Sequence, residues 1–208
     1  MQQLTTDLTA IRASTASLEM VWGGDGPGTG YEALVQAVRG RGYDQTCDGA
    51  YDSSRDVKPW QAAGDDAFGG AIHGVQDTAV AGTGTLAGVG FRTGAARVVV
   101  LAVENALRDT AYGHDLPSGA CLGAATALDA ENALTSAGAA FVGINAYEFQ
   151  DIDGTPQDQL RSLAANTGAL WDEDGDGLKD DLAVLAGSWD WPPVDQAVDV
   201  ILQVAGVE

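Results

Sequence analysis

Cysteine and histidine are scarce in this sequence, and their scarcity excludes several kinds of site. Its 208 residues include two cysteines and two histidines. Cys47 and Cys121 lie too far apart in the chain, and are too few, to form a structural zinc site by themselves. The two residues form either one disulfide that closes a long loop or two free thiols, and an oxidising compartment would favour the disulfide.

Positive charge is also scarce. Lys and Arg total 10 against 30 for Asp and Glu, so the formal net charge is −20 at pH 7. A surface this acidic repels nucleic acids and anionic membranes, and it attracts cations. We therefore expect no nucleic-acid partner. The charge also suits an extracellular or a high-salt setting.

Long apolar runs are absent from the sequence. A membrane-spanning helix needs about 20 consecutive apolar residues, and we therefore predict no membrane insertion. The first residues, Met1 to Asp7, have neither the basic start nor the apolar stretch of a secretory signal peptide. We still expect an extracellular or cell-surface location, which the acidic charge favours.

One short apolar run stands out and ends in a carboxylate. Residues 97–103 are one Arg followed by Val-Val-Val-Leu-Ala-Val, and Glu104 comes next. Such a run predicts the central strand of a parallel sheet, buried on both faces by helices. Ligands of these sheets bind outside the carboxyl ends of the strands, so Glu104 is a candidate functional residue. The alternative is that Glu104 starts a solvated loop with Asn105.

The rest of the chain predicts helices and strands in alternation. Helices are predicted over 5–20, 31–38, 124–137 and 156–165 and from Pro193, with further strands over 139–146 and 181–186. This order favours an α/β fold with a doubly wound, mainly parallel sheet flanked by helices. At this length we expect one domain over residues 1–208. Residues 41–92, rich in Asp and Gly, predict a long irregular insertion with short helices or a hairpin.

A run of aspartates and glycines at 171–181 predicts a metal site. Asp172, Asp174 and Asp176 occupy alternate positions, and Gly177 follows them. Alternating carboxylates before a sharp glycine turn bring several hard oxygens around one cation, as in positions one, three, five and six of a calcium loop. Without a cation, carboxylates packed so closely would repel one another.

The remaining positions of this calcium-loop insertion are less regular. The carbonyl of Leu178 takes the seventh position and Asp180 the ninth, but Ala183 stands at the twelfth, where a bidentate Glu is usual. Asp181 could partly substitute, as in the shorter loops of thrombospondin type 3 repeats and dockerins, which the segment resembles. We predict that calcium binds here as a structural clip. The alternative is a soluble Asp/Gly turn.

Three further segments carry a resemblance to a known family. They are the loop and helix at 23–38, the strand and its lead-in at 91–103, and the strand at 141–144 with Gln159-Leu160. Together they resemble a von Willebrand factor A domain, closest to the integrin β-subunit I-like branch, over residues 21–208. In that branch an Asp-x-Pro-Glu-Gly-Gly loop precedes a helix, and the matching loop here begins at Asp25.

The resemblance implies a metal ion-dependent adhesion site. Its remnants would be Asp25, Thr29 and Glu104, since Glu104 matches the family's Asp at the end of the central strand. The family's Asp-x-Ser-x-Ser motif is missing, so the resemblance implies a domain truncated at its N-terminus, with a magnesium or manganese site that is weak or lost. A missing central element would leave open strand edges, so we expect marginal stability or association with another chain.

The function that the resemblance implies is non-enzymatic, with no catalytic residues. It is a divalent-cation-dependent, protein-binding module of the adhesion type, stabilised by the calcium loop. Two alternatives stay open. One is a hydrolase that uses a metal-activated water near Asp25, Glu104 and His114, although no nucleophile or Gly-x-Ser-x-Gly elbow is present. The other is a purely structural, calcium-clipped domain.

Overall fold

The computed structural model divides the chain into two compact units. The first comprises Met1–Asp25, Gln36–Ala95 and Pro117–Gly123, and the second comprises Gly26–Val35, Ala96–Leu116 and Ala124–Glu208. The structure describes residues 6–7, 9–10, 12–13, 27–60, 66–70, 74, 79–115, 124–146, 156–186 and 194–206. Among the described helices, none is long and apolar enough to span a membrane.

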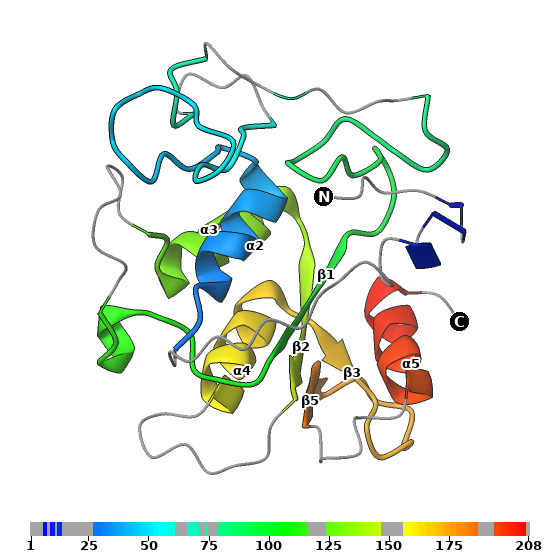
Figure 1. Cartoon of the computed structure of the whole chain (residues 1–208). Helices are drawn as coiled ribbons and strands as arrows, with labels where there is room; N and C mark the ends of the chain where they lie inside the picture. Colours follow the sequence, from blue (N-terminus) through cyan, green and yellow to red (C-terminus); the bar gives the residue numbers. More distant parts are fainter. Residues whose placement is uncertain are drawn as a thin grey trace. The chain divides into compact units, whose positions relative to one another are not determined.

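A three-stranded parallel sheet forms the centre of the second unit (Figure 1). Its strands are β1 (Val98–Val103), β2 (Ala140–Asn145) and β5 (Val184–Ala186), in the order β1-β2-β5. Strand β2 pairs with β1 along its whole length and with β5 at its carboxyl end. The predicted α/β class with a parallel sheet is therefore confirmed, whereas the doubly wound order of a von Willebrand A domain stays a prediction.

The central strand of this sheet is β2. Residues 141–144 of β2 are all buried, whereas no residue of β1 is buried and Val100 is 41% exposed. The prediction that 97–103 is a central strand covered on both faces is therefore wrong. Its apolar, β-branched composition favours a strand, but its place in the sheet depends on which distant segments pair with it.

The outer side of β1 is open in the described part of the unit. Alternate residues of a parallel strand direct their backbone N–H and C=O groups to opposite sides. The carbonyl of Val103 accepts a hydrogen bond from Ala146, next to β2. The backbone groups of Val98, Val100 and Ala102 therefore face away from β2, and no described residue pairs with them. Association with another chain through this edge stays a prediction.

Helices flank the parallel sheet. They are α3 (Ala127–Ala137), α4 (Pro156–Thr167) and α5 (Val194–Ala205). Helices α3 and α4 pack on each other and on β2, and α5 contacts β1 and β2 from the other side (Figure 1). Helix α3 begins with a capping box of Thr126 and Asp129 and ends at Gly138, whose φ is 58°. The helices predicted over 124–137 and 156–165 are confirmed.

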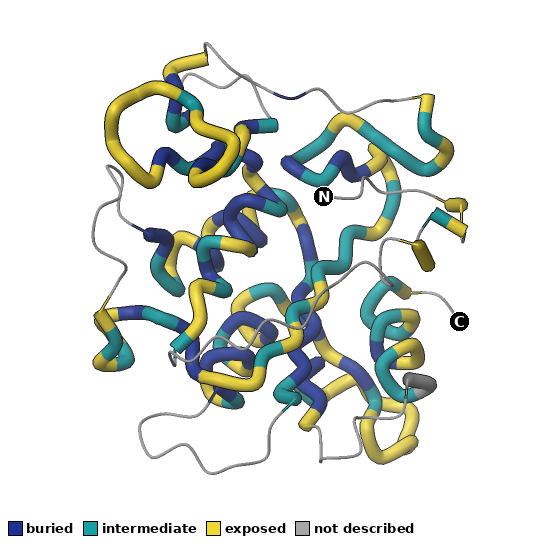
Figure 2. Tube along the Cα trace, in the orientation of Figure 1, coloured by how far each residue is buried: buried dark blue, intermediate teal, exposed yellow. Residues whose placement is uncertain are grey.

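The core of the second unit lies between β2 and the two helices α3 and α4, where the buried residues gather (Figure 2). Leu134, Phe141, Leu160 and Leu163 are at most 1% exposed. Burial of each such side chain contributes about 1.5–3 kcal/mol. Gln159 is buried among them. Its Oε1 accepts a hydrogen bond from the N–H of Leu107 at 2.7 Å, and its Nε2 donates one to the carbonyl of Leu107 at 2.9 Å. These paired bonds satisfy its amide.

A short antiparallel hairpin adjoins this core. It consists of β3 (Leu170–Trp171) and β4 (Asp181–Leu182). The strand predicted over 181–186 is therefore two strands, because β4 belongs to the hairpin and β5 to the parallel sheet. Ala183 lies between them and is fully buried.

The first unit contains the end of α2 (Gly30–Arg39) and long irregular segments. The described residues of 41–92 form turns with two isolated antiparallel bridges, Tyr43–Val57 and Leu86–Phe91, and none of them is helical. Of the two alternatives predicted for this segment, short helices or a hairpin, the described residues have antiparallel pairing and no helix. Of the helix predicted over 5–20, residues 6–7, 9–10 and 12–13 are described. Residues 9–10 and 12–13 are helical, and residues 6–7 are not.

The close contact between β2 and α4 gives the first prediction. A β carbon at Gly143 would lie 2.8 Å from the β carbon of Leu160, which cannot rotate away. We expect Gly143→Ala to reduce the free energy of unfolding by about 1–3 kcal/mol, measured by urea denaturation. Gly28→Ala is the control, because a β carbon there has no neighbour within 4 Å. Equal urea midpoints for the two variants would contradict this packing.

Candidate metal centre

The Asp-rich segment 172–180, here the 172–180 loop, connects β3 to β4. Trp171, the last residue of β3, pairs with Asp181, the first residue of β4, so the two ends of the loop are held together. Trp171 is 4% exposed, and its burial fixes the hairpin to the core of the second unit. The loop therefore extends into solvent from a rigid base.

Three carboxylates of the loop converge on one point. Asp172, Asp174 and Asp176 each offer an oxygen, and these oxygens all lie within 4.8 Å of one another. Calcium binds oxygen at about 2.3–2.6 Å, so two ligands on opposite sides of one ion lie about 5 Å apart. This is the one such group among the residues that the structure describes. The group could therefore hold one metal ion.

Hydrogen bonds to Asp172 shape the loop. Its Oδ1 accepts from the N–H groups of Gly175 and Asp176 at 2.7 and 3.1 Å, and its Oδ2 accepts from Gly177 at 2.9 Å. Gly175 and Gly177 have φ values of 76° and 90°. Glycine adopts this left-handed conformation at little cost, so both turns are local consequences of the sequence. Together they direct alternate side chains to the same side.

The other predicted ligands are placed differently. Asp180 is exposed and is not part of the three-carboxylate group. Leu178 is 60% exposed, and its N–H donates to Asp176 Oδ1 at 2.8 Å. Asp181 Oδ2 accepts from the N–H of Glu173 at 3.1 Å, so Asp181 closes the loop. With Ala183 buried at the twelfth position, a calcium ion would need water molecules to complete its coordination.

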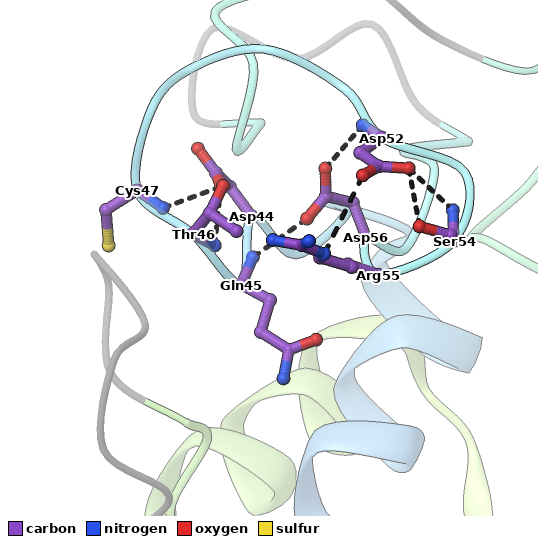
Figure 3. A network of polar contacts seen from close by, with 8 residues as sticks. All are labelled: Asp44, Gln45, Thr46, Cys47, Asp52, Ser54, Arg55 and Asp56. Carbon is purple, nitrogen blue, oxygen red and sulfur yellow. Dashed lines mark hydrogen bonds and ion pairs between the residues drawn. The ribbon is translucent and has the colours of Figure 1, made fainter.

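A loop of the first unit repeats this hydrogen-bond pattern. The carboxylate of Asp44 accepts from the N–H groups of Thr46 and Cys47 at 3.1 and 2.8 Å (Figure 3). It also accepts from the N–H group of Gly49 at 2.8 Å. The two loops are counted from Asp44 and from Asp172. In both, the backbone N–H groups of the fourth and sixth residues donate to the carboxylate of the first residue. Cys47 and Gly49, which occupy those positions, have φ values of 62° and 71°. The two loops therefore share one backbone arrangement.

Asp56 connects the two ends of this loop, which spans residues 44–56. Its Oδ1 accepts from Gln45 at 3.0 Å and its Oδ2 from Asp52 at 2.6 Å (Figure 3). Sequence reasoning missed the loop because its third position is Thr46, although the pattern Asp-x-Thr-x-Asp-Gly at 44–49 was a readable signal. Its carboxylates form no close group of three, within the part of the chain described. Backbone N–H groups already satisfy them.

Cys47 in this loop is disulfide-bonded. The other cysteine of the sequence, Cys121, lies outside the described residues. Of the two alternatives that the sequence left open at Cys47, the structure therefore has the disulfide.

The remnants of the adhesion site are only partly placed. Asp25 lies outside the described residues, and Thr29 and Glu104 are both exposed. The N–H of Gly28 donates to the carbonyl of Ala106 at 2.8 Å, so the chain before α2 runs beside the segment that follows β1. Neither Thr29 nor Glu104 belongs to the three-carboxylate group described above.

Of the residues proposed for a hydrolase, Glu104 and His114 are described and Asp25 is not. His114 Nε2 is buried and has no hydrogen-bond partner among the described residues. The backbone N–H of His114 donates to the carbonyl of Asp109 at 3.0 Å. No hydrogen bond joins His114 to Glu104 within the described part of the chain.

Comparisons with known proteins identify no relative. No protein-family model matches the sequence, and neither curated proteins nor solved structures give a match. The resemblance to a von Willebrand factor A domain therefore stays a proposal, and the arguments about function depend on this chain's own residues.

Two carboxyl groups of the loop at 44–56 have lowered pKa values. Burial alone would raise the pKa of Asp44, but the N–H groups of Gly49, Cys47 and Thr46 outweigh it and lower the pKa below its ordinary value of 3.8. Hydrogen bonds from the N–H and hydroxyl of Ser54 lower the pKa of Asp52. These hydrogen bonds therefore favour the ionised forms of Asp44 and Asp52.

The lowered pKa of Asp44 predicts a pH-dependent contribution to stability. Because the pKa is lower in the folded than in the unfolded state, the contribution is present above the ordinary value of 3.8 and is lost as pH falls through the folded value. We expect Asp44→Asn to lower the urea midpoint at pH 7 and to lower it much less at acidic pH. Asp48→Asn, at an exposed residue of the same loop, should have little effect. A loss that is equal at both pH values would contradict the prediction.

Proposed function

We propose that this chain is a non-enzymatic module of a secreted or surface protein, and that calcium bound in the 172–180 loop stabilises it. The convergence of three carboxylates within 4.8 Å carries the proposal. Unit charges about 4 Å apart repel by roughly 1 kcal/mol per pair in water, and a divalent cation would remove that repulsion. The net charge of −20 also favours cation uptake.

A structural role suits this loop better than a sensing role. The loop joins two short strands, whereas a calcium sensor places its loop between two helices that reorient. Calcium suits it better than magnesium, because calcium accepts six to eight oxygens in flexible geometry and magnesium requires a near-ideal octahedron. The carbonyl of Leu178 and water would supply the ligands beyond the three carboxylates.

A protein partner is the second part of the proposal, and it derives from the resemblance to a von Willebrand factor A domain. A mixed α/β fold with a parallel sheet flanked by helices is compatible with that family. Thr29 and Glu104 are exposed and accessible to a ligand. With so few protein ligands, magnesium or manganese would bind there weakly. The side of β1 with which no described residue pairs is a further surface for another chain, since unpaired strand edges recruit strands.

Calcium titration of the wild type and two loop variants tests the proposal. Asp174→Asn removes one converging carboxylate, and Glu173→Gln removes the same charge from an exposed neighbour outside the group. In isothermal titration calorimetry we expect one calcium ion per wild-type chain. Asp174→Asn should weaken binding by about tenfold or more, which is about 1.4 kcal/mol, and Glu173→Gln should change it little.

Chelation gives an independent measurement of the same site. At calcium concentrations about 100 times the dissociation constant, binding should add about 2.7 kcal/mol to the free energy of unfolding, and chelator should remove this gain. Equal heats of titration for the wild type and Asp174→Asn would refute the site. A second calcium ion per chain, retained by Asp174→Asn, would place a further cation site outside the 172–180 loop.

A further inference from the structure

One residue of α5 contacts both ends of the 172–180 loop. The Oε1 of Gln203 accepts a hydrogen bond from the backbone N–H of Asp172 at 2.9 Å, and its backbone carbonyl accepts one from Lys179 Nζ at 2.6 Å. Asp172 provides the first of the three converging carboxylates, and Lys179 follows the last of them. A single helical residue thus bridges the two ends of the candidate site.

The bond from Lys179 brings a positive charge to the carboxyl end of α5. The last carbonyls of a helix have no intrahelical partner and carry partial negative charge, which a basic residue in the last turn usually balances. The last turn of α5 has no basic residue. The carbonyl of Gln203 accepts from the N–H of Gly206 at 3.1 Å and from Lys179, so the loop caps the helix.

This placement also keeps the acidic group available for a cation. Lys179 is the one basic residue in the 172–180 loop, yet it forms no ion pair with the three carboxylates in the part of the chain described. Its ammonium group is directed to the end of α5 instead. The carboxylates therefore retain their negative charge, while the loop as a whole stays attached to the helix.

We propose that Gln203 is a positioning residue for the calcium site, and that calcium binding is coupled through it to the docking of the last turn of α5. This inference rests on the proposed calcium function. Without the ion, repulsion among the carboxylates would favour opening of the loop, which would move the Asp172 N–H and the Lys179 ammonium away from Gln203. The helix end then loses its cap. Because coupling between two events is reciprocal, a loosened helix end weakens calcium binding by the same factor.

Two substitutions at Gln203 separate positioning from simple packing. Gln203→Met keeps a similar length but removes the acceptor, and Gln203→Glu keeps an acceptor oxygen. We expect Gln203→Met to weaken calcium binding by about fivefold, the change that corresponds to one hydrogen bond of about 1 kcal/mol. Gln203→Glu should bind calcium at least about as tightly as the wild type does. Calorimetric titration measures both.

Hydrogen exchange of the α5 amides distinguishes coupling through Gln203 from a purely structural role of Gln203. In the wild type, calcium should slow exchange over residues 200–206 by about fivefold, and this calcium effect should disappear in Gln203→Met. A structural role alone would speed exchange equally with and without calcium. If Gln203→Met does not fold, the wild-type comparison with calcium and with chelator still tests the coupling.

The outcomes distinguish the two proposals. If the wild type binds calcium but exchange over 200–206 is the same in calcium and in chelator, the coupling is overturned and the calcium site stands. Equal affinities of the wild type and a folded Gln203→Met variant would overturn it as well. If the wild type binds no calcium, both the calcium site and the coupling fail.

Discussion

Burial of Ala183 connects the acidic loop to the core, and the second unit depends on this connection. The N–H of Ala183 donates to the carbonyl of Ala169 at 3.0 Å, and its carbonyl accepts from Gly143 of β2 at 2.9 Å. One residue therefore ends the β3–β4 hairpin and begins the pairing of β5 with the central strand. Because it is fully buried, the hairpin cannot shift without disturbing the sheet. The three converging carboxylates of this loop are thus positioned by the core.

The two Asp-rich loops show how much of such a site is local. In each, a carboxylate accepts from N–H groups three and five residues later, and residues with positive φ allow both turns. They differ at the third position, where Thr46 stands in one loop and Asp174 in the other. The same backbone arrangement therefore forms a turn whose carboxylates are satisfied by backbone N–H groups in the first unit. In the second unit it forms a candidate cation site.

Among the described strands of the second unit, the most apolar one lies at the edge of the sheet. Strand β1 leaves Val100 41% exposed, while β2, which contains Gly143, is buried over four consecutive residues. Gly143 allows α4 to approach closely, since Leu160 occupies the space that a side chain would need. Burial in this sheet thus follows helix packing and not strand hydrophobicity.

Features that depend on near neighbours in the chain could be predicted from the residues alone. These include the helix capped at Thr126, the strands around 98–103 and 140–145, and the convergence of Asp172, Asp174 and Asp176, because each is decided by hydrogen bonds or side-chain spacing over a few positions. The edge position of β1 and the contact between Asp172 and Gln203, 31 residues apart, were decided by tertiary structure. Such long-range pairings depend on how helices and strands pack, which no local pattern encodes.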